Sequence, residues 1–199
     1  MNTPSDHTAE QLARKALTEV LQMAYSGELA AANAYRGHWI SVRDAQEKKD
    51  IFQIEIEELQ HRQDVGMMLD SLGAKPLFRR EILMNMIGRG IGFLCLIGGW
   101  FIPMYGAGKI EASNIQEYER AAQYAHIAKH LDWVDPLLEM AELEWDHEQY
   151  FYQKVKGHFL NKWITPWREP EPKINIRERF AAFCHEQENF HATTKVIHF

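Results

Sequence analysis

Apolar residues recur at helical spacing through four long segments of the chain, and polar, glycine-rich or proline-containing stretches separate these segments. The pattern predicts helices over residues 8–41, 44–72, 102–129 and 136–158. Gly73 directly follows the second of these, at a position where glycine commonly ends a helix. A shorter amphipathic helix is expected at 174–190, after a proline-rich connector. The sequence therefore predicts an all-α protein of the four-helix-bundle class.

The chain length also bears on how these helices are organised. A chain of 199 residues is long enough to bury one full hydrophobic core. We expect the bundle to occupy residues 1–159. The C-terminal extension, residues 160–199, is expected to pack on the bundle as a connector and a short helix.

Each of the four apolar stripes is interrupted by acidic side chains, and two of the stripes also carry a histidine. Side chains three positions apart share one helix face, so a Glu-x-x-His pair can reach one centre. An unpaired buried carboxylate costs several kcal/mol, and the stripes contain no Lys or Arg to pair with it. This disfavours a buried salt-bridge network and predicts a metal centre. The candidate ligands are Glu28, Glu58, His61, Glu111, Glu144 and His147.

The spacing of the candidate ligands fits two antiparallel helix pairs. Glu28 and Glu58 are 30 residues apart, and Glu111 and Glu144 are 33 apart. The midpoints fall at Arg43 and just after Ile127, close to polar runs where turns are expected. Each arm would be roughly 20 Å long at 1.5 Å per residue, so the ligands should meet at one height in the bundle.

Several polar residues near the ligands allow further expectations. Glu55, one turn before Glu58, is a candidate outer partner, and Asp64 either holds the ring of His61 or faces solvent. Glu57 points about 100° away from Glu58 and should be solvated. The residues expected to carry surface charges are Glu142 and Glu148, and those expected to be structural or exposed histidines are His38, His126, His130, His158, His185, His191 and His198.

The two halves of the chain resemble each other beyond the ligands. Tyr35 follows Glu28 by seven residues, and Tyr118 follows Glu111 by seven. This indicates a faint two-fold repeat of a Glu-helix and a Glu-x-x-His-helix. We expect both tyrosines to be core residues with hydrogen-bonded hydroxyls. The alternative is a functional role as a radical site or a proton relay.

Residues 79–108 differ in composition from the rest of the chain. They are rich in glycine and carry no charge from Ile91 to Gly108, and Pro103 should break or kink a helix there. We expect a crossover hairpin between the two helix pairs. An uncharged run of about 18 residues is at the lower limit for a membrane span. We expect this one not to span, because both helix pairs must meet around one site.

The charge around this crossover segment is opposite in sign to the charge of the chain. A basic, apolar and partly exposed segment suggests contact with an anionic membrane surface. A homo-oligomer interface and a buried position in the core are the alternatives. The local charge is +3, in a chain with a formal net charge of −6, and the residues concerned are Lys75, Arg79, Arg80 and Arg89 against Glu81.

The overall composition excludes several classes of protein. The acidic balance disfavours a general nucleic-acid binder. Cys95 and Cys184 are isolated, so neither a disulfide framework nor a Cys-x-x-Cys metal site is expected. The polar first ten residues do not resemble a signal peptide. A cytoplasmic location is expected, with the inner face of the membrane as the place of any peripheral contact.

The composition of the ligand set indicates which metals it suits. Four carboxylates and two imidazoles suit iron or manganese, whereas zinc normally takes fewer carboxylates in a tetrahedral site. Four glutamates also neutralise the charge of two divalent ions. We therefore expect two iron ions, and manganese satisfies the same donors.

The sequence resembles the demethoxyubiquinone hydroxylase family, which consists of ferritin-like di-iron monooxygenases. The resemblance covers roughly residues 15–155 and includes the glycine-rich apolar crossover. It implies O₂-dependent hydroxylation of a quinone ring, an external electron donor, a peripheral membrane habit and bridging roles for Glu58 and Glu144. The motifs that carry it are Gly27-Glu28 with Ala31, Ala32 and Tyr35, Glu58-x-x-His61, Glu111 with Tyr118, and Glu144-x-x-His147.

Other functions share this ligand pattern. A ferritin-like iron-binding or storage protein is one alternative, although an exposed apolar crossover suits a many-subunit cage poorly. A di-iron peroxidase, or a hydroxylase with another substrate, is a further alternative.

Overall fold

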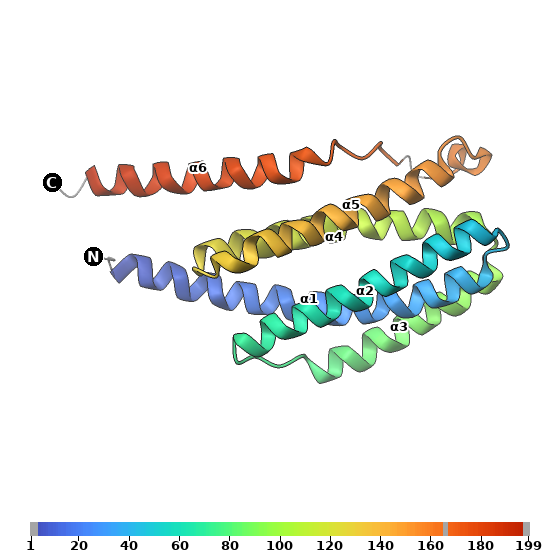
Figure 1. The fold of residues 1–199 in the computed structure, drawn as a ribbon, viewed down its shortest axis with the longest axis horizontal. Helices are drawn as coiled ribbons and strands as arrows, with labels where there is room; N and C mark the ends of the chain where they lie inside the picture. Colours follow the sequence, from blue (N-terminus) through green and yellow to red (C-terminus); the bar gives the residue numbers. More distant parts are fainter. Residues whose placement is uncertain (1–3, 165–166, 197–199) are drawn as a thin grey trace.

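The computed structural model describes residues 4–164 and 167–196 of the chain, with side chains from residue 8 to residue 189. Within these residues every regular element is a helix and no strand occurs (Figure 1). The elements are α1 (Pro4–Ser41), α2 (Ala45–Ser71), α3 (Phe78–Ile97), α4 (Phe101–Ile127), η1 (Leu131–Trp133), α5 (Val134–Val155), η2 (Phe159–Lys162) and α6 (Ile174–Val196).

The boundaries predicted for α1, α2, α4 and α5 agree with the structure to within a few residues, whereas α6 is longer than predicted and continues to Val196 instead of ending at residue 190. Local chemistry explains where the helices end. Asp44 caps α2, because its carboxylate accepts hydrogen bonds from the N–H groups of Gln46 and Glu47. Gly73 stops α2 with a φ of +70°, as expected. α5 ends three residues earlier than predicted, since Lys156 is extended and Gly157 has a φ of +81°.

The predicted crossover hairpin is wrong, because residues 78–97 form one continuous helix. This helix, α3, packs along α1 and runs in the same direction (Figure 1). The chain turns at Gly98–Trp100, where Gly99 has a φ of +71°. Pro103 does not break a helix, since it lies in the first turn of α4, where a backbone N–H has no helical partner.

The glycines of α3 serve close helix packing. A Cβ on Gly88 would lie 2.3 Å from the carbonyl oxygen of Ala30, and one on Gly92 would lie 2.7 Å from that of Asn33. Gly37 of α1 faces Gly92, since a Cβ on Gly37 would lie 2.1 Å from the Gly92 carbonyl oxygen. Glycines four apart share one helix face, which allows the two backbones to touch.

Within the described residues, no helix combines the length and apolarity needed to cross a membrane.

The core consists of two apolar clusters at different levels of the bundle. One contains Leu21 of α1 and Leu69 of α2, together with buried residues from the second half of α4 and the first half of α5. The other contains Ile51, Met104 and Phe151, from the opposite ends of α2, α4 and α5. In every bundle helix the candidate ligands lie between these two clusters in sequence. The bundle therefore holds one polar layer between two apolar ones.

The C-terminal extension is attached to α4 and α5 by specific contacts. The indole of Trp167 packs against Gly108, where an added Cβ would lie 1.9 Å from it, and its N–H donates to Glu148 at 3.1 Å. On α6, Ile176 is only 1% exposed, and Arg177 pairs with Glu142 at 2.6 Å. The partition into residues 1–159 and 160–199 stays a prediction.

Candidate metal centre

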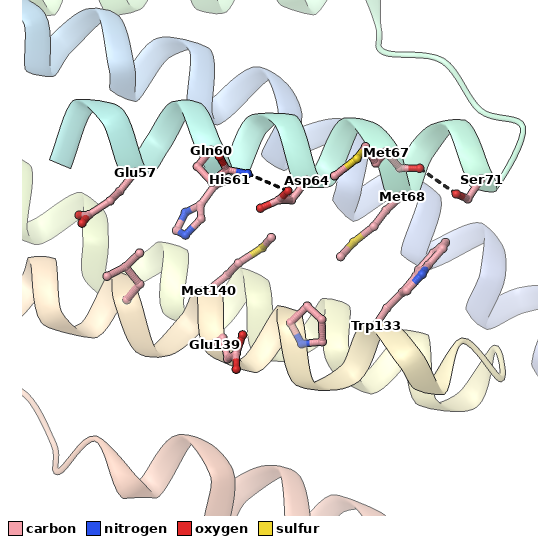
Figure 2. Close-up of a pocket in the computed structure, with 12 residues that line it drawn as sticks. Glu57, Gln60, His61, Asp64, Met67, Met68, Ser71, Trp133, Glu139 and Met140 are labelled. Carbon is pink, nitrogen blue, oxygen red and sulfur yellow. Dashed lines mark hydrogen bonds between the residues drawn. The ribbon is translucent and has the colours of Figure 1, made fainter. Parts of the chain in front are cut away.

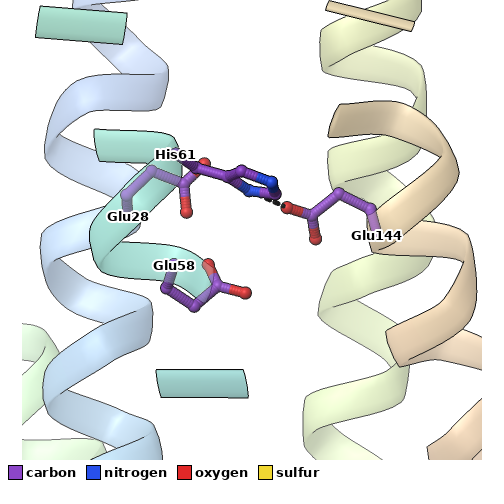
Figure 3. A group of neighbouring side chains, drawn as sticks. All are labelled: Glu28, Glu58, His61 and Glu144. Carbon is purple, nitrogen blue, oxygen red and sulfur yellow. Dashed lines mark hydrogen bonds and ion pairs between the residues drawn. The ribbon is translucent and has the colours of Figure 1, made fainter. Parts of the chain in front are cut away.

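Six polar side chains occupy the layer between the two apolar clusters, and each is at most 4% exposed. α1 and α4 each contribute one glutamate, and α2 and α5 each contribute a glutamate and a histidine one turn later. Figure 3 shows four of them pointing toward one another from α1, α2 and α5. All six side chains predicted from the sequence are buried here: Glu28, Glu58, His61, Glu111, Glu144 and His147.

The potential ligand atoms form two overlapping groups. In each group one ligand atom per residue lies within 4.8 Å of all the others. The two groups have Glu58 and Glu144 in common. The two groups supply donor atoms for two neighbouring cations, with Glu58 and Glu144 common to both groups. The first group is Glu28, Glu58, His61 and Glu144, and the second is Glu58, Glu111, Glu144 and His147.

Several of these buried atoms have no hydrogen-bond partner within the described part of the chain. They are one oxygen of Glu28, both oxygens of Glu58 and Nδ1 of His147. Within the described residues, the ion pairs of this layer join Glu58 and Glu144 to the two histidines, including His61 to Glu144 at 3.0 Å, and none involves Lys or Arg. Buried polar groups are normally satisfied, so four potential ligand atoms without hydrogen bonds in one layer fit a cation. The donor set accordingly fits two divalent ions.

Burial and mutual repulsion shift the pKa values of these carboxyl groups. Burial, followed by the charge of Glu58, raises the pKa of Glu28 well above its usual value. Burial and the nearby Glu144 raise the pKa of Glu58 to about 8, and the same two causes raise that of Glu111. Burial acts on Glu144 too, but the hydrogen bond from His61 lowers its pKa to about 2. Without metal, the cluster therefore retains protons at neutral pH.

Two tyrosines bind glutamates of the opposite half of the chain. The hydroxyl of Tyr35 on α1 donates to Glu111 on α4, and the hydroxyl of Tyr118 on α4 donates to Glu28 on α1. Both tyrosines are at most 4% exposed, so the prediction of core tyrosines with bonded hydroxyls is confirmed. A radical or proton-relay role stays a prediction. The crossed pair matches the two-fold repeat in the sequence.

Two further residues contact the candidate ligands. Glu57 was expected to be solvated, but its Oε2 lies 2.8 Å from Nε2 of His147, which corrects that prediction. Asn114 donates to Glu111 at 3.0 Å and to Glu144 at 3.3 Å. The period of α2 alone did not reveal Glu57, because its partner is on α5. Asn114 could have been found from the sequence, because it follows Glu111 by three residues and therefore shares its helix face.

Three other expectations can now be compared with the contacts. The expectation that Glu148 is a surface charge is wrong, since it is 7% exposed and accepts the hydrogen bond from Trp167. Glu55 is bound by Arg36 at 2.8 Å and by Trp39 at 2.6 Å, so it belongs to an adjacent network. Asp64 accepts a hydrogen bond from Gln60. The recorded hydrogen bonds of these residues therefore go to groups outside the six candidate ligands.

Two pockets approach the centre from different sides. An open groove of about 480 Å³ between α2 and α5 reaches His61, and its wall includes Asp64, Glu139 and several methionines (Figure 2). A second pocket of about 220 Å³ lies between α1, α3 and α4 and ends at Glu111. Its walls are almost entirely apolar, with Ile91 and Leu94 from α3 among them. The centre thus has one mixed and one apolar approach.

Comparisons of this chain with models of protein families, with curated proteins and with solved structures found no match.

Proposed function

We propose that the chain is a ferritin-like, O₂-dependent di-iron monooxygenase that hydroxylates a quinone or a related apolar ring. The observation that carries the proposal is the pair of four-residue donor groups that share Glu58 and Glu144. Alternating single glutamates and Glu-x-x-His pairs on four helices are typical of carboxylate-bridged di-metal proteins. The family resemblance of the motifs supports the same reading.

The donor set suggests how the chain would hold the metals. Glu28, Glu58 and His61 would bind one ion, Glu111, Glu144 and His147 the other, with Glu58 and Glu144 between them. When bound in the reduced state, such a pair supplies the two electrons that O₂ activation needs. The overall reaction places one oxygen atom in a ring C–H bond and releases the other as water, with two electrons from a donor and two protons. The chain fixes the geometry through Tyr35, Tyr118, Asn114 and Glu57.

The apolar pocket supports an apolar substrate. Its volume of about 220 Å³ exceeds the 150 Å³ or so of an engineered cavity that binds benzene. Because the pocket ends at Glu111, a ring bound there lies beside a candidate ligand. Its wall is almost entirely apolar and offers water few hydrogen-bond partners, so a bound ring would displace water from beside the centre.

Turnover in a single cycle tests the proposal. The chain is loaded with Fe²⁺, reduced, freed of excess reductant, and mixed with isotope-labelled O₂ and a short-chain benzoquinone that has a free ring carbon. We expect about two irons per chain and a product that gains one labelled oxygen atom. Glu144→Gln should lose both the bound iron and the labelled product, whereas Glu186→Gln, at an exposed position, should keep both. Iron uptake far beyond two per chain, without product, contradicts the proposal and favours storage.

A peripheral membrane contact through α3 forms part of the proposal. The outward face of α3 exposes large apolar side chains, including Phe93 and Leu96, which are 62% and 50% exposed. Exposed basic residues accompany them at Lys75, Arg79 and Arg89. Apolar anchors next to basic groups suit an anionic lipid surface. Such a surface would also supply a substrate with a lipid tail.

Vesicle binding tests this contact. Phosphatidylglycerol vesicles should sediment the protein more than phosphatidylcholine vesicles, and salt should weaken the difference. Leu96→Asp should reduce sedimentation, and the same change at Leu12, which is 63% exposed on α1, should not. If Leu96→Asp instead converts a dimer into a monomer and leaves vesicle binding unchanged, α3 is an interface between copies of the chain.

A further inference from the structure

The apolar pocket has one polar side chain in its wall that the proposed metal centre does not use. His38 lies on α1, lines the pocket, and is only 2% exposed. Its Nε2 is buried and has no hydrogen-bond partner within the described part of the chain. The other strongly polar groups in this wall, Tyr35 and Glu111, are bonded to each other. His38 is therefore the side chain with unused hydrogen-bonding capacity beside the cavity.

Two aromatic rings hold the His38 imidazole in a fixed orientation. Its ring stacks on Phe151 with centroids 5.8 Å apart at 17°, and on Tyr35 at 6.3 Å and 16°. Tyr35 and Phe151 are themselves stacked, so the three rings form one nearly parallel set. Contacts with both rings restrict reorientation of the imidazole, because protein interiors are close-packed. The same set joins His38 to the centre, since Tyr35 donates to Glu111.

The environment also determines the charge of His38. It lies in the last turn of α1, where the helix dipole favours a cation, but burial dominates and lowers its pKa to about 4. The imidazole is therefore neutral at physiological pH. A neutral imidazole has one N–H donor and one acceptor nitrogen. It can thus donate to a carbonyl oxygen or accept from a hydroxyl group.

A buried, unpaired ring nitrogen disfavours folding unless something else satisfies it. The adjacent pocket is large enough for one substituted ring, and its wall exposes almost no polar surface, so a bound ring reaches the buried Nε2 of His38 only when the wall side chains move to admit its oxygen. An apolar ring without oxygen would leave the nitrogen unsatisfied, whereas a ring with a carbonyl or hydroxyl would not. This difference favours oxygen-bearing rings.

We propose that His38 is a specificity-determining residue of the apolar pocket, where its neutral imidazole binds a ring oxygen of the substrate and so fixes which ring edge faces Glu111. This deepens the proposed function and depends on it, because it names the polar group by which the substrate is recognised. A quinone carbonyl and the hydroxyl of a reduced quinone both suit this partner. The occupant is thus a single ring with an oxygen substituent.

Two probes of equal shape test the assignment. Tetramethyl-1,4-benzoquinone and 1,2,4,5-tetramethylbenzene share a ring and four methyl groups, but only the first carries oxygen. Their affinities are measured by calorimetry on the full chain, without metal and with a chelator, so that no metal contributes. His38→Phe keeps a stacking ring and removes the nitrogens. It should weaken binding of the quinone by about five- to tenfold, as expected for one lost hydrogen bond, and leave the hydrocarbon unaffected.

Two further variants serve as controls. Ile91→Val, in the same pocket wall, should weaken both probes to a similar extent. His38→Gln restores a donor and an acceptor and should keep most of the preference for the quinone. Retained hydrocarbon binding shows that the pocket is intact. If His38→Phe binds neither probe, the affinities for the two probes are compared in His38→Gln instead.

An unchanged ratio of the two affinities in His38→Phe, or a preference lost in His38→Gln despite hydrocarbon binding, overturns the assignment. Wild-type protein that binds neither probe overturns it as well. None of these results concerns the proposed function itself, which fails separately if the chain takes up no iron or forms no oxygenated product.

Discussion

Glu58→Gln should have opposite effects on the metal-free and metal-bound protein. Glu58 is completely buried, and neither of its carboxylate oxygens has a hydrogen-bond partner within the described residues. The substitution keeps the shape of the side chain and removes its ability to ionise. In the absence of metal the ionised carboxylate is unfavourable, whereas in the proposed metal centre it would be a ligand shared between two sites.

The magnitude follows from the pKa of Glu58. Burial and the charge of Glu144 raise it from the ordinary 4.5 to about 8, which corresponds to a cost on the order of 5 kcal/mol for ionising Glu58 in the folded metal-free protein. A raised folded-state pKa gives stability that is fully present below the unfolded pKa and is lost as the pH rises through about 8. The metal-free wild type should therefore lose stability progressively between about pH 4.5 and pH 8. Glu58→Gln should lack most of this loss.

The free energy of unfolding of the wild type and of Glu58→Gln is measured by urea unfolding at pH 5.5 and pH 8.5 in the presence of a chelator. The variant should exceed the wild type by only about 1 kcal/mol at pH 5.5 and by up to about 5 kcal/mol at pH 8.5. Glu186→Gln, on the exposed face of α6, should follow the wild type at both pH values. Addition of Mn²⁺, which needs no protection from air, should then stabilise the wild type through binding to the folded state, and the variant much less.

Two outcomes would refute this reasoning. If Glu58→Gln is no more stable than the wild type at pH 8.5 without metal, Glu58 does not carry a buried ionisation cost. If Mn²⁺ stabilises both proteins equally, Glu58 is not a ligand, and the proposed sharing of two carboxylates fails with it.

Three more predictions concern packing and the partners of the ligands. Gly92→Ala should lower the free energy of unfolding in urea by about 1–3 kcal/mol, because its Cβ would lie 2.7 Å from a carbonyl oxygen of α1. Gly90→Ala places its Cβ in open space and should raise the free energy of unfolding by about 0.5–1 kcal/mol. Equal effects of the two substitutions would contradict the close packing of α3 on α1. Glu57→Gln should weaken Mn²⁺ affinity about tenfold or more without changing the number of ions bound, since the Glu57 carboxylate holds the ring of His147. Unchanged affinity in a competitive chelator titration would exclude that role. Tyr35→Phe should destabilise the metal-free protein by about 1–3 kcal/mol through the loss of a buried hydrogen bond, and an unaltered urea midpoint would show that this bond contributes nothing.

The sequence alone was sufficient for α1, α2, α4 and α5 and for the residues of the polar layer, but not for α3. Both depend on spacing along one helix, because a side chain at i+3 shares the face of residue i. Glu58 and His61 therefore had to point the same way once their segment was helical. The distances from Glu28 to Glu58 and from Glu111 to Glu144 fixed the level at which they would meet.

Features that depend on contacts between helices could not be derived in the same way. Glu57 points away from Glu58 on its own helix, and only the position of α5 brings His147 to it. The glycines of α3 were ambiguous for a similar reason. Glycine serves both sharp turns and close packing, and the sequence does not show that Gly88 and Gly92 face the backbone of α1. The expectation for Pro103 was wrong although the predicted start at residue 102 already placed it in the first turn of a helix, where proline is tolerated.

The crossed tyrosines suggest why the polar layer requires both halves of the chain. Tyr35 belongs to the first half and binds Glu111 of the second, while Tyr118 of the second half binds Glu28 of the first. Either helix pair alone supplies three of the six donors and lacks the hydroxyl that orients its own single glutamate. Each of the two donor groups likewise draws on both helix pairs, since Glu58 and Glu144 are common to both. Metal affinity should therefore appear only when the two pairs pack together, so that ion binding and bundle assembly are coupled.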